Sequence, residues 1–116
     1  QVQLRGRTYS VRYIGIDTPE TVAPGRPVEP FRVAAADRTR SLVEGKVVTL
    51  AKDVSETDHF GRLLRYVYVD GRVVNALLVE EGYARSSTYP PDVKHQELFQ
   101  RLEREARETK RGLWGE

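Results

Sequence analysis

The sequence predicts an α+β fold, with strands and helices gathered in separate parts of the chain. Residues 1–17 alternate apolar and polar side chains, and residues 63–69 are rich in Tyr and Val, as β-strands are. Apolar stripes at helical spacing follow in residues 31–43 and in the last third of the chain. Separate runs of strands and helices favour this class over a doubly wound parallel sheet.

The composition is that of a single globular domain covering residues 1–116. Charged residues make up 31% of the chain and hydrophobic residues 39%, and no apolar run approaches the roughly 18 residues that a membrane helix needs. The absence of cysteine excludes disulfides and thiolate metal sites. The net charge of +2 is a weak indication of an anionic partner.

The first predicted element is a hairpin over residues 1–17. Its second strand ends near Asp17, because Pro19 cannot donate a hydrogen bond to a strand ladder. Strict alternation would place Arg12 and Asp17 on opposite faces of this strand. The two side chains serve one site only if the strand bulges or twists near its end, and Gly15 offers a place for that.

A loop and a helix come next. Residues 18–30 hold four of the six prolines and show no periodicity, which indicates a loop. A helix is predicted from Phe31, because apolar residues then recur on one helical stripe opposite a row of arginines. Pro30 suits the first turn of this helix and Gly45 suits its end.

The second half of the chain holds predicted strands followed by two predicted helices. Residues 47–50 and 63–69 are predicted strands, and an Asp-Gly turn follows the second. Asn75 is a good N-cap for a short helix through Val79, which Gly82 terminates. A final amphipathic helix stops at Gly112, and the apolar residues after it are expected to fold back onto the core.

Three charged residues stand at or just beyond the end of the first predicted strand pair: Arg12, Asp17 and Glu20. Functional groups are often held on a loop anchored to a rigid element. A guanidinium donor with two acids suits a metal-assisted reaction on an anion. The alternative is a strand capped by a turn, with the three charges in solvent.

A second charged cluster, Asp-His-Phe-Gly-Arg at residues 58–62, directly precedes the strand at residues 63–69. Gly61 permits a sharp turn into that strand. Arg62 would then stand at the end of the sheet, where it can reach a site. The alternative is an ordinary surface arginine.

The chain resembles the staphylococcal nuclease-like, or thermonuclease, family. The resemblance rests on VRYIGIDTPET (residues 11–21), DHFGRLLRYVYVDGRVVNALLVEEGYA (residues 58–84) and the ending at residues 95–114, in the same order over almost the whole chain. It implies a five-stranded OB-type β-barrel with three helices. It also implies calcium-dependent hydrolysis of DNA and RNA phosphodiesters that leaves 3′-phosphate products.

The resemblance assigns roles to individual residues. Arg12 and Arg62 resemble the family's two phosphate-binding arginines, and Glu20 resembles the residue that orients or deprotonates the attacking water. Asp17 resembles a calcium-binding carboxylate, with the Thr18 carbonyl as a second oxygen ligand, and hard oxygen donors are what calcium prefers.

The aromatic contacts carry over less directly. Tyr89 stands near the family's aromatic contact to the nucleoside, and packing on the Pro-Pro turn is the alternative role for its ring. Phe60 stands where the family often has a tyrosine near the phosphate, so a hydroxyl contact would be lost.

The family's first strand and an Asp-Gly-Asp-Thr element, which holds another calcium ligand, should precede Gln1. The first strand of the expected barrel is therefore missing from this sequence. We expect residues upstream of Gln1 to supply that strand and the second carboxylate.

Two functions stay open at this point. The first is a calcium-dependent nuclease, an endonuclease of the thermonuclease type, that acts as a monomer on DNA and RNA with single strands preferred. The second is a non-catalytic OB-fold module that binds nucleic acid or a modified peptide. Glu20 favours the first, because a binding module would have no need of it. The resemblance and the lack of cysteine favour a secreted or periplasmic protein without a membrane segment.

Overall fold

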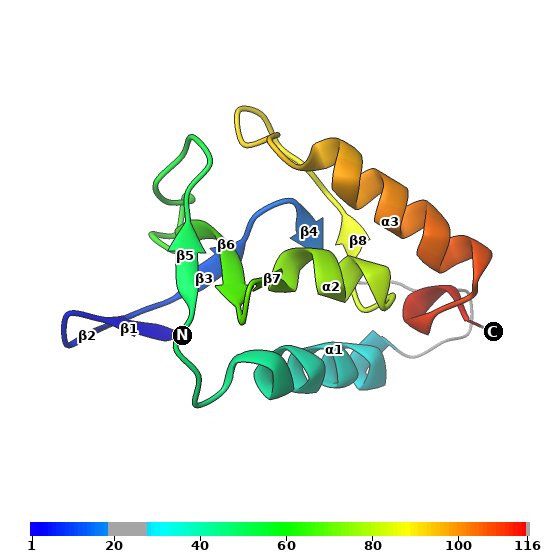
Figure 1. Cartoon of the computed structure of the whole chain (residues 1–116), viewed down its shortest axis with the longest axis horizontal. Helices are drawn as coiled ribbons and strands as arrows, with labels where there is room; N and C mark the ends of the chain where they lie inside the picture. The colour runs from blue at the N-terminus through cyan, green and yellow to red at the C-terminus, as the bar shows by residue number, and fades with distance from the viewer. Residues whose placement is uncertain (19–27, 116) are drawn as a thin grey trace.

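The computed structural model describes residues 1–18 and 28–115, with side chains in the second range from residue 32 onward (Figure 1). Three α-helices lie within the described residues, as the sequence predicts, and strands occur before and between them. In chain order the elements are β1 (Val2–Leu4), β2 (Arg7–Tyr9), β3 (Val11–Tyr13), β4 (Ile16–Asp17), α1 (Val28–Val43), β5 (Thr49–Ala51), β6 (Leu63–Val69), β7 (Arg72–Val73), α2 (Val74–Glu80), β8 (Arg85–Ser86), α3 (Gln96–Glu108) and the 3-10 turn η1 (Gly112–Trp114).

The strand β6 is the centre of the main sheet. β3 pairs with it in parallel, β5 pairs with it antiparallel, and β7 returns along its end as a hairpin. The pairs β1–β2 and β4–β8 form two further small sheets. Across the described part of the chain these sheets do not join into one closed barrel, so the expected five-stranded OB barrel is not seen as such. The α+β class is confirmed.

The predicted hairpin over residues 1–17 is only partly correct. β1 and β2 do pair around a turn, with Val2 opposite Tyr9. The chain then leaves the hairpin, because β3 pairs with β6 and β4 pairs with β8. Long-range pairing thus divides a stretch that looks continuous in the sequence.

The break between β3 and β4 lies at Gly15, where the strand was expected to deform. The φ of Gly15 is +79°, a left-handed value that favours glycine. A Cβ built on Gly15 would lie 2.6 Å from Cε2 of Phe99 in α3, so the Phe99 ring fills the space that a side chain at Gly15 would need. Ile14 and Ile16 are both buried on either side of this turn.

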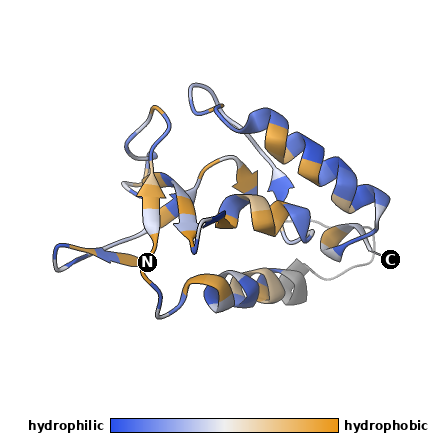
Figure 2. Ribbon diagram, in the orientation of Figure 1, coloured by the Kyte–Doolittle hydropathy of each residue, from blue (hydrophilic) through white to orange (hydrophobic). Residues whose placement is uncertain are grey.

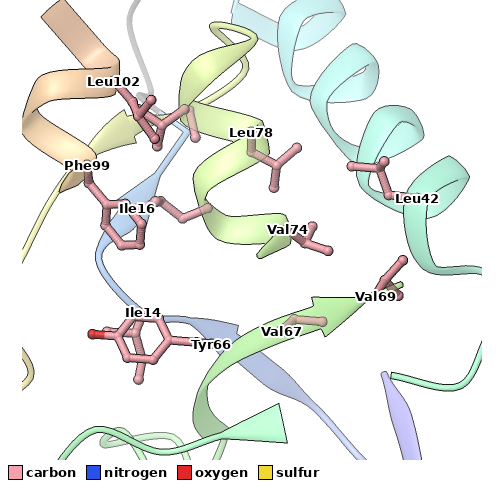
Figure 3. Close-up of a cluster of buried hydrophobic side chains, with 12 residues drawn as sticks. Ile14, Ile16, Leu42, Tyr66, Val67, Val69, Val74, Leu78, Phe99 and Leu102 are labelled. Carbon is pink, nitrogen blue, oxygen red and sulfur yellow. The ribbon is translucent and has the colours of Figure 1, made fainter. Parts of the chain in front are cut away.

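The hydrophobic core lies between β6 and the three helices. Figure 3 shows side chains from each of these elements converging with Ile14 and Ile16. α3 contributes Phe99 and Leu102 from its apolar stripe, while the rest of its surface is largely hydrophilic (Figure 2). Burial of such a stripe, rather than intrinsic propensity, supplies most of a helix's stability in a folded protein.

Asn75 does not cap α2, which corrects the sequence-based prediction. The N-cap position is Val73, without a side-chain cap bond, and Asn75 lies in the first turn with 0% of its surface exposed. Its Oδ1 accepts the Val67 amide at 2.9 Å, and its Nδ2 donates to the Ile14 carbonyl at 3.0 Å. Asn75 therefore joins α2 to β6 and to the β3–β4 turn.

Two element boundaries also differ from the prediction. α1 begins at Val28 rather than at Phe31, with Pro30 still in its first turn, where its missing amide proton costs little. β5 begins at Thr49 rather than at residue 47, and Val47 is 97% exposed. Apolar character alone therefore misplaced the start of this strand.

The end of the chain folds back as predicted. Leu113 is buried, and its amide donates to the Gly82 carbonyl at 2.8 Å. The guanidinium of Arg107 lies 4.0 Å from the centre of the Trp114 ring. Within the described residues, no helix is both long and apolar enough to cross a membrane.

Candidate functional site

A pocket of about 390 Å³ lies where β3, β4 and α1 meet. We call it the arginine pocket, after the polar residues that line it: Arg12, Asp17, Thr18, Arg32, Thr39 and Arg62. The parallel register of β3 on β6 explains why two distant arginines share it. Arg12 is paired with Leu64, and the Leu63 amide donates to the Ser10 carbonyl at 2.9 Å. Arg12 and Arg62 therefore stand near one end of adjacent strands.

Arg12 spans the break between β3 and β4. Its Nη1 donates to the carbonyls of Tyr13 at 2.8 Å and Ile16 at 2.7 Å, because the turn at Gly15 brings both oxygens to the same side. Its Nη2 lies 3.8 Å from Oδ1 of Asp17. The turn thus brings together the two side chains that strict alternation would separate.

Asp17 and Thr18 are the sequence-predicted metal ligands. The Asp17 side chain is half exposed, and Thr18 lines the same pocket. Oxygen donors of this kind fit a hard cation such as calcium. Among the described residues, however, no group of three or more His, Cys, Asp or Glu side chains comes together to hold a metal. The donors fit calcium in kind and fall short of its usual 6–8 ligands in number.

Glu20 lies outside the described residues, so its position relative to Asp17 stays a prediction.

Arg62 is held by Asp58, a residue for which no separate role was predicted. Asp58 Oδ2 accepts Nε of Arg62 at 2.6 Å, and Oδ1 accepts the backbone amides of Phe60 and Arg62, both at 2.9 Å. Burial raises the pKa of the Asp58 carboxyl, but these hydrogen bonds outweigh it and the net pKa is lowered. The sequence does contain a feature that could have predicted these bonds. An aspartate before a glycine-containing turn often accepts hydrogen bonds from the backbone amides that follow it.

A second pocket, of about 460 Å³, shares Arg12 and Arg62 with the first. We call it the aromatic pocket, because Phe60 and Tyr89 line it and are 82% and 69% exposed. Tyr89 is thus not buried against the Pro-Pro turn, although Pro90 lines the same pocket. The two arginines stand between a charged pocket and an aromatic one.

The family model for staphylococcal nuclease homologues matches residues 10–116 of this chain. The chain belongs to this family. It is 38% identical over 109 residues to a thermonuclease of Staphylococcus hyicus, covering 94% of this chain and 64% of the relative. It is 39% identical over 116 residues to the endonuclease YncB of Bacillus subtilis (strain 168), covering 98% of this chain and 55% of the relative.

A third relative of this family member is the SPbeta prophage-derived endonuclease YokF of Bacillus subtilis (strain 168). It is 40% identical over 116 residues, which cover 98% of this chain and 39% of the relative. The chain therefore spans less than two thirds of the length of each of these relatives.

In this family member, two aspartates tie together the loops that wall the aromatic pocket. Asp92 is buried, and its Oδ1 accepts the amides of Val54 at 2.9 Å and Ser55 at 2.7 Å. In return, Asp53 Oδ2 accepts the Lys94 amide at 2.8 Å. Sequence reasoning missed this reciprocal link, because it joins residues that are far apart in the chain.

His95 has a structural position. Its ring packs edge-on against Tyr66, with centroids 4.6 Å apart, and also contacts Phe99. Burial, followed by the nearby charge of Lys94, lowers the His95 pKa, although Asp53 opposes this. This ring packing indicates a structural role for His95.

Proposed function

We propose that this chain is a nuclease that hydrolyses phosphodiester bonds in DNA and RNA. The observation that carries the proposal is the convergence of Arg12, Arg62 and Asp17 on the arginine pocket. Two guanidinium groups suit a phosphate, because each can present paired N–H donors to its oxygens. Family membership and relatives named thermonuclease and endonuclease support the same chemistry.

In the proposed reaction, Arg12 and Arg62 hold the scissile phosphate and stabilise the charge that develops on five-coordinate phosphorus. Asp58 occupies Nε of Arg62, so the two Nη nitrogens are the donors that a phosphate would meet. Glu20 accepts a proton from the attacking water. The bond between phosphorus and the 5′ oxygen breaks, and the 5′ oxygen takes up a proton from water, which leaves a 3′-phosphate and a 5′-hydroxyl.

Calcium is the proposed cofactor, with the Asp17 carboxylate and the Thr18 carbonyl as its ligands. A bound divalent cation would neutralise charge on the phosphate and make bound water more acidic. Asp17 suits the role of a calcium ligand because its carboxylate is half exposed and lines the same pocket as both arginines. With one carboxylate among the described lining residues, we expect calcium affinity near the weak end of known sites, about 10⁻³ M.

The aromatic pocket extends the proposal to a single-stranded substrate. The exposed rings of Phe60 and Tyr89 lie beside the same two arginines and can stack on unpaired bases. We further propose a monomer that works in a secreted or periplasmic setting. These last two points rest on the family resemblance.

The competing proposal is a non-catalytic module that binds nucleic acid through the same surface. The exposed aromatic rings favour it as much as they favour a nuclease, because base stacking needs no catalytic group. Such a module would bind oligonucleotides and leave them intact with or without a metal.

The deciding experiment incubates end-labelled single-stranded DNA and RNA with the chain in calcium and in excess chelator. We expect cleavage in calcium only, with fragments that gain a 3′-hydroxyl on phosphatase treatment. Glu20→Gln should reduce turnover by about 10²–10⁴-fold, the usual scale of general-base help, and leave oligonucleotide binding nearly unchanged. Binding without cleavage by the unsubstituted chain in calcium would establish the competing proposal.

A further inference from the structure

The helix α3 reaches the strands beside the arginine pocket at two points on one of its faces. The Phe99 ring packs against Gly15, and one helical turn later the Glu103 side chain reaches β8. Oε1 of Glu103 accepts the backbone amide of Ser86 at 2.8 Å. The proposed reaction uses neither Glu103 nor β8.

The Glu103 carboxylate is held in place for this contact. Its side chain is 18% exposed, and its second oxygen, Oε2, lies 3.2 Å from Nη2 of Arg107, four residues further along α3. The Arg107 guanidinium in turn lies 4.0 Å from the centre of the Trp114 ring. Each carboxylate oxygen thus has its own partner, one on β8 and one on α3. A hydrogen bond from an amide to a charged acceptor is also stronger than one between neutral groups.

The strand β8 connects this carboxylate to β4, its one partner strand in the described sheets. The Ser87 amide donates to the Gly15 carbonyl at 2.9 Å, so Ile16 and Ser86 form a pair whose backbone groups point away from each other. The Ser86 amide therefore points toward α3 and Glu103. A ladder of two residues on each strand is marginal by itself, so the place of β4 depends on what supports β8 from outside.

The opposite edge of β4 faces the arginine pocket. The Ile16 carbonyl accepts Nη1 of Arg12 at 2.7 Å, and Oδ1 of Asp17 lies 3.8 Å from Nη2 of the same arginine. The β4–β8 pair therefore lies between Glu103 on one side and Arg12 on the other. A movement of β8 toward or away from α3 would change the place of Asp17 relative to Arg12.

We propose that Glu103 is a positioning residue, which acts through Ser86 and the β4–β8 pair on the place of Asp17. This inference rests on the proposed function, in which Asp17 holds calcium beside the phosphate that Arg12 binds. Glu103 itself takes no part in the chemical step. The property that matters is the reach of its acceptor oxygen to the Ser86 amide, rather than its negative charge.

Two substitutions separate the reach of this oxygen from the charge. Glu103→Gln keeps an acceptor oxygen at the same distance from the helix and removes the charge. Glu103→Asp keeps the charge and shortens the side chain by one methylene, which withdraws the acceptor from the Ser86 amide. We expect Glu103→Asp to lower kcat/KM by roughly 10- to 100-fold, the scale of a small misplacement of a group that acts on the substrate. Glu103→Gln should retain most of the activity, because it preserves the hydrogen bond.

Glu105 provides the matched control. Its half-exposed side chain pairs with Arg101 at 3.9 Å on the same helix, and two residues along a helix place it on a different face from Glu103. Glu105→Gln and Glu105→Asp repeat the same two changes away from the Ser86 amide. Both should leave kcat/KM unchanged.

A second measurement follows the strand pair without calcium or substrate. In NMR spectra of the metal-free chain, the amide signals of Ile16 and Asp17 should shift in Glu103→Asp and return close to their original positions in Glu103→Gln. A calcium titration followed through the Asp17 amide should then give weaker binding for Glu103→Asp than for Glu103→Gln. Thermal melts of all variants separate these local effects from a general loss of stability.

The results separate this inference from the proposed function. Equal kcat/KM for the two Glu103 variants, or the larger loss in Glu103→Gln, would overturn the inference while the proposed nuclease stands. A lower Tm of Glu103→Asp with unshifted Ile16 and Asp17 amides would assign Glu103 a purely structural role and overturn it as well. If the unsubstituted chain does not cleave oligonucleotides in calcium, the proposed function fails, and the amide shifts alone decide whether Glu103 sets the place of β4.

Discussion

Asp58 holds the guanidinium of Arg62, with 2.6 Å between Oδ2 and Nε, and the same carboxylate closes the loop that carries this arginine. One acidic side chain therefore sets both the backbone and the side-chain orientation of Arg62. The ion pair itself is partly exposed and contributes little to folding stability. For the proposed function its importance lies in geometry, because a small misplacement of a group that holds substrate can cost about a hundredfold in rate.

The first prediction follows from this pair. Asp58→Asn keeps an oxygen that can accept the two amides, but it removes the charged partner of Arg62 Nε. We expect kcat/KM to fall by roughly 10- to 100-fold, because a misplacement of about 1 Å can cost about a hundredfold in rate. The melting temperature should change little. Asp37→Asn is the matched control, since Asp37 pairs with Arg40 at 2.8 Å outside the arginine pocket. Unchanged kcat/KM in Asp58→Asn would mean that Arg62 is oriented by other groups.

The two site arginines should respond differently to lysine. Arg62→Lys keeps the charge and loses the planar fork, and we expect kcat/KM to fall by about 10²–10³-fold with a nearly unchanged Tm. Arg12→Lys should lower both kcat/KM and Tm, because Nη1 of Arg12 also donates to the Tyr13 and Ile16 carbonyls across the β3–β4 turn. Steady-state kinetics and thermal melts check this. A lysine that supports the original kcat/KM at either position would exclude bidentate phosphate binding there.

Asn75 should be among the most sensitive positions for stability. Asn75→Ala leaves the Val67 amide and the Ile14 carbonyl without their partner in the core, and each such loss costs about 1–3 kcal/mol. Urea unfolding should show a loss of about 3 kcal/mol in the free energy of unfolding. Gln100→Ala, an amide removed from the exposed side of α3, is the control. A loss below about 1 kcal/mol would show that water or a backbone shift replaces these bonds.

Asp92 gives a prediction for pH. Burial raises the pKa of this carboxyl, but the bonds from Ser55 and Val54 outweigh it, so the pKa in the folded chain lies below its ordinary value. A lowered folded pKa means that Asp92 stabilises the fold fully above about pH 4 and loses this effect as pH falls through the folded pKa. Asp92→Asn cannot titrate, so its free energy of unfolding should fall less steeply below pH 4. Urea unfolding from pH 3 to 7 measures this, and parallel curves would contradict it.

The parts of the fold that the sequence predicts are those with local causes. Gly15 breaks a strand because only glycine readily takes its φ, and the turn at Asp70 and Gly71 follows from the same preference. β6 stands out because a strand buried on both faces is almost continuously apolar.

The remaining features depend on residues that are distant in the chain. Asn75 has the right chemistry for a cap, but buried bonds to β6 and to the β3–β4 turn decide its role. The link between Asp92 and the loop at Val54 leaves no periodic signal. Helical spacing placed Arg32 on the polar side of α1. It could not predict whether the Arg32 side chain faces solvent or lines the arginine pocket, as it does. The roles of Arg12, Asp17, Glu20 and Arg62 stay predictions.

The contact between Gly15 and Phe99 makes the folded state of the β3–β4 turn depend on the docking of the last α-helix, α3. The Phe99 ring occupies the place of a side chain at Gly15, so the turn between Arg12 and Asp17 is built against α3. Proteins open in cooperative units well below the threshold of global unfolding. If α3 detached in such an event, the turn would lose its packing while β6 and its neighbours stayed paired. The geometry of the arginine pocket then persists only as long as α3 remains docked, and amide hydrogen exchange at Ile14 and Phe99 should report one shared opening rate.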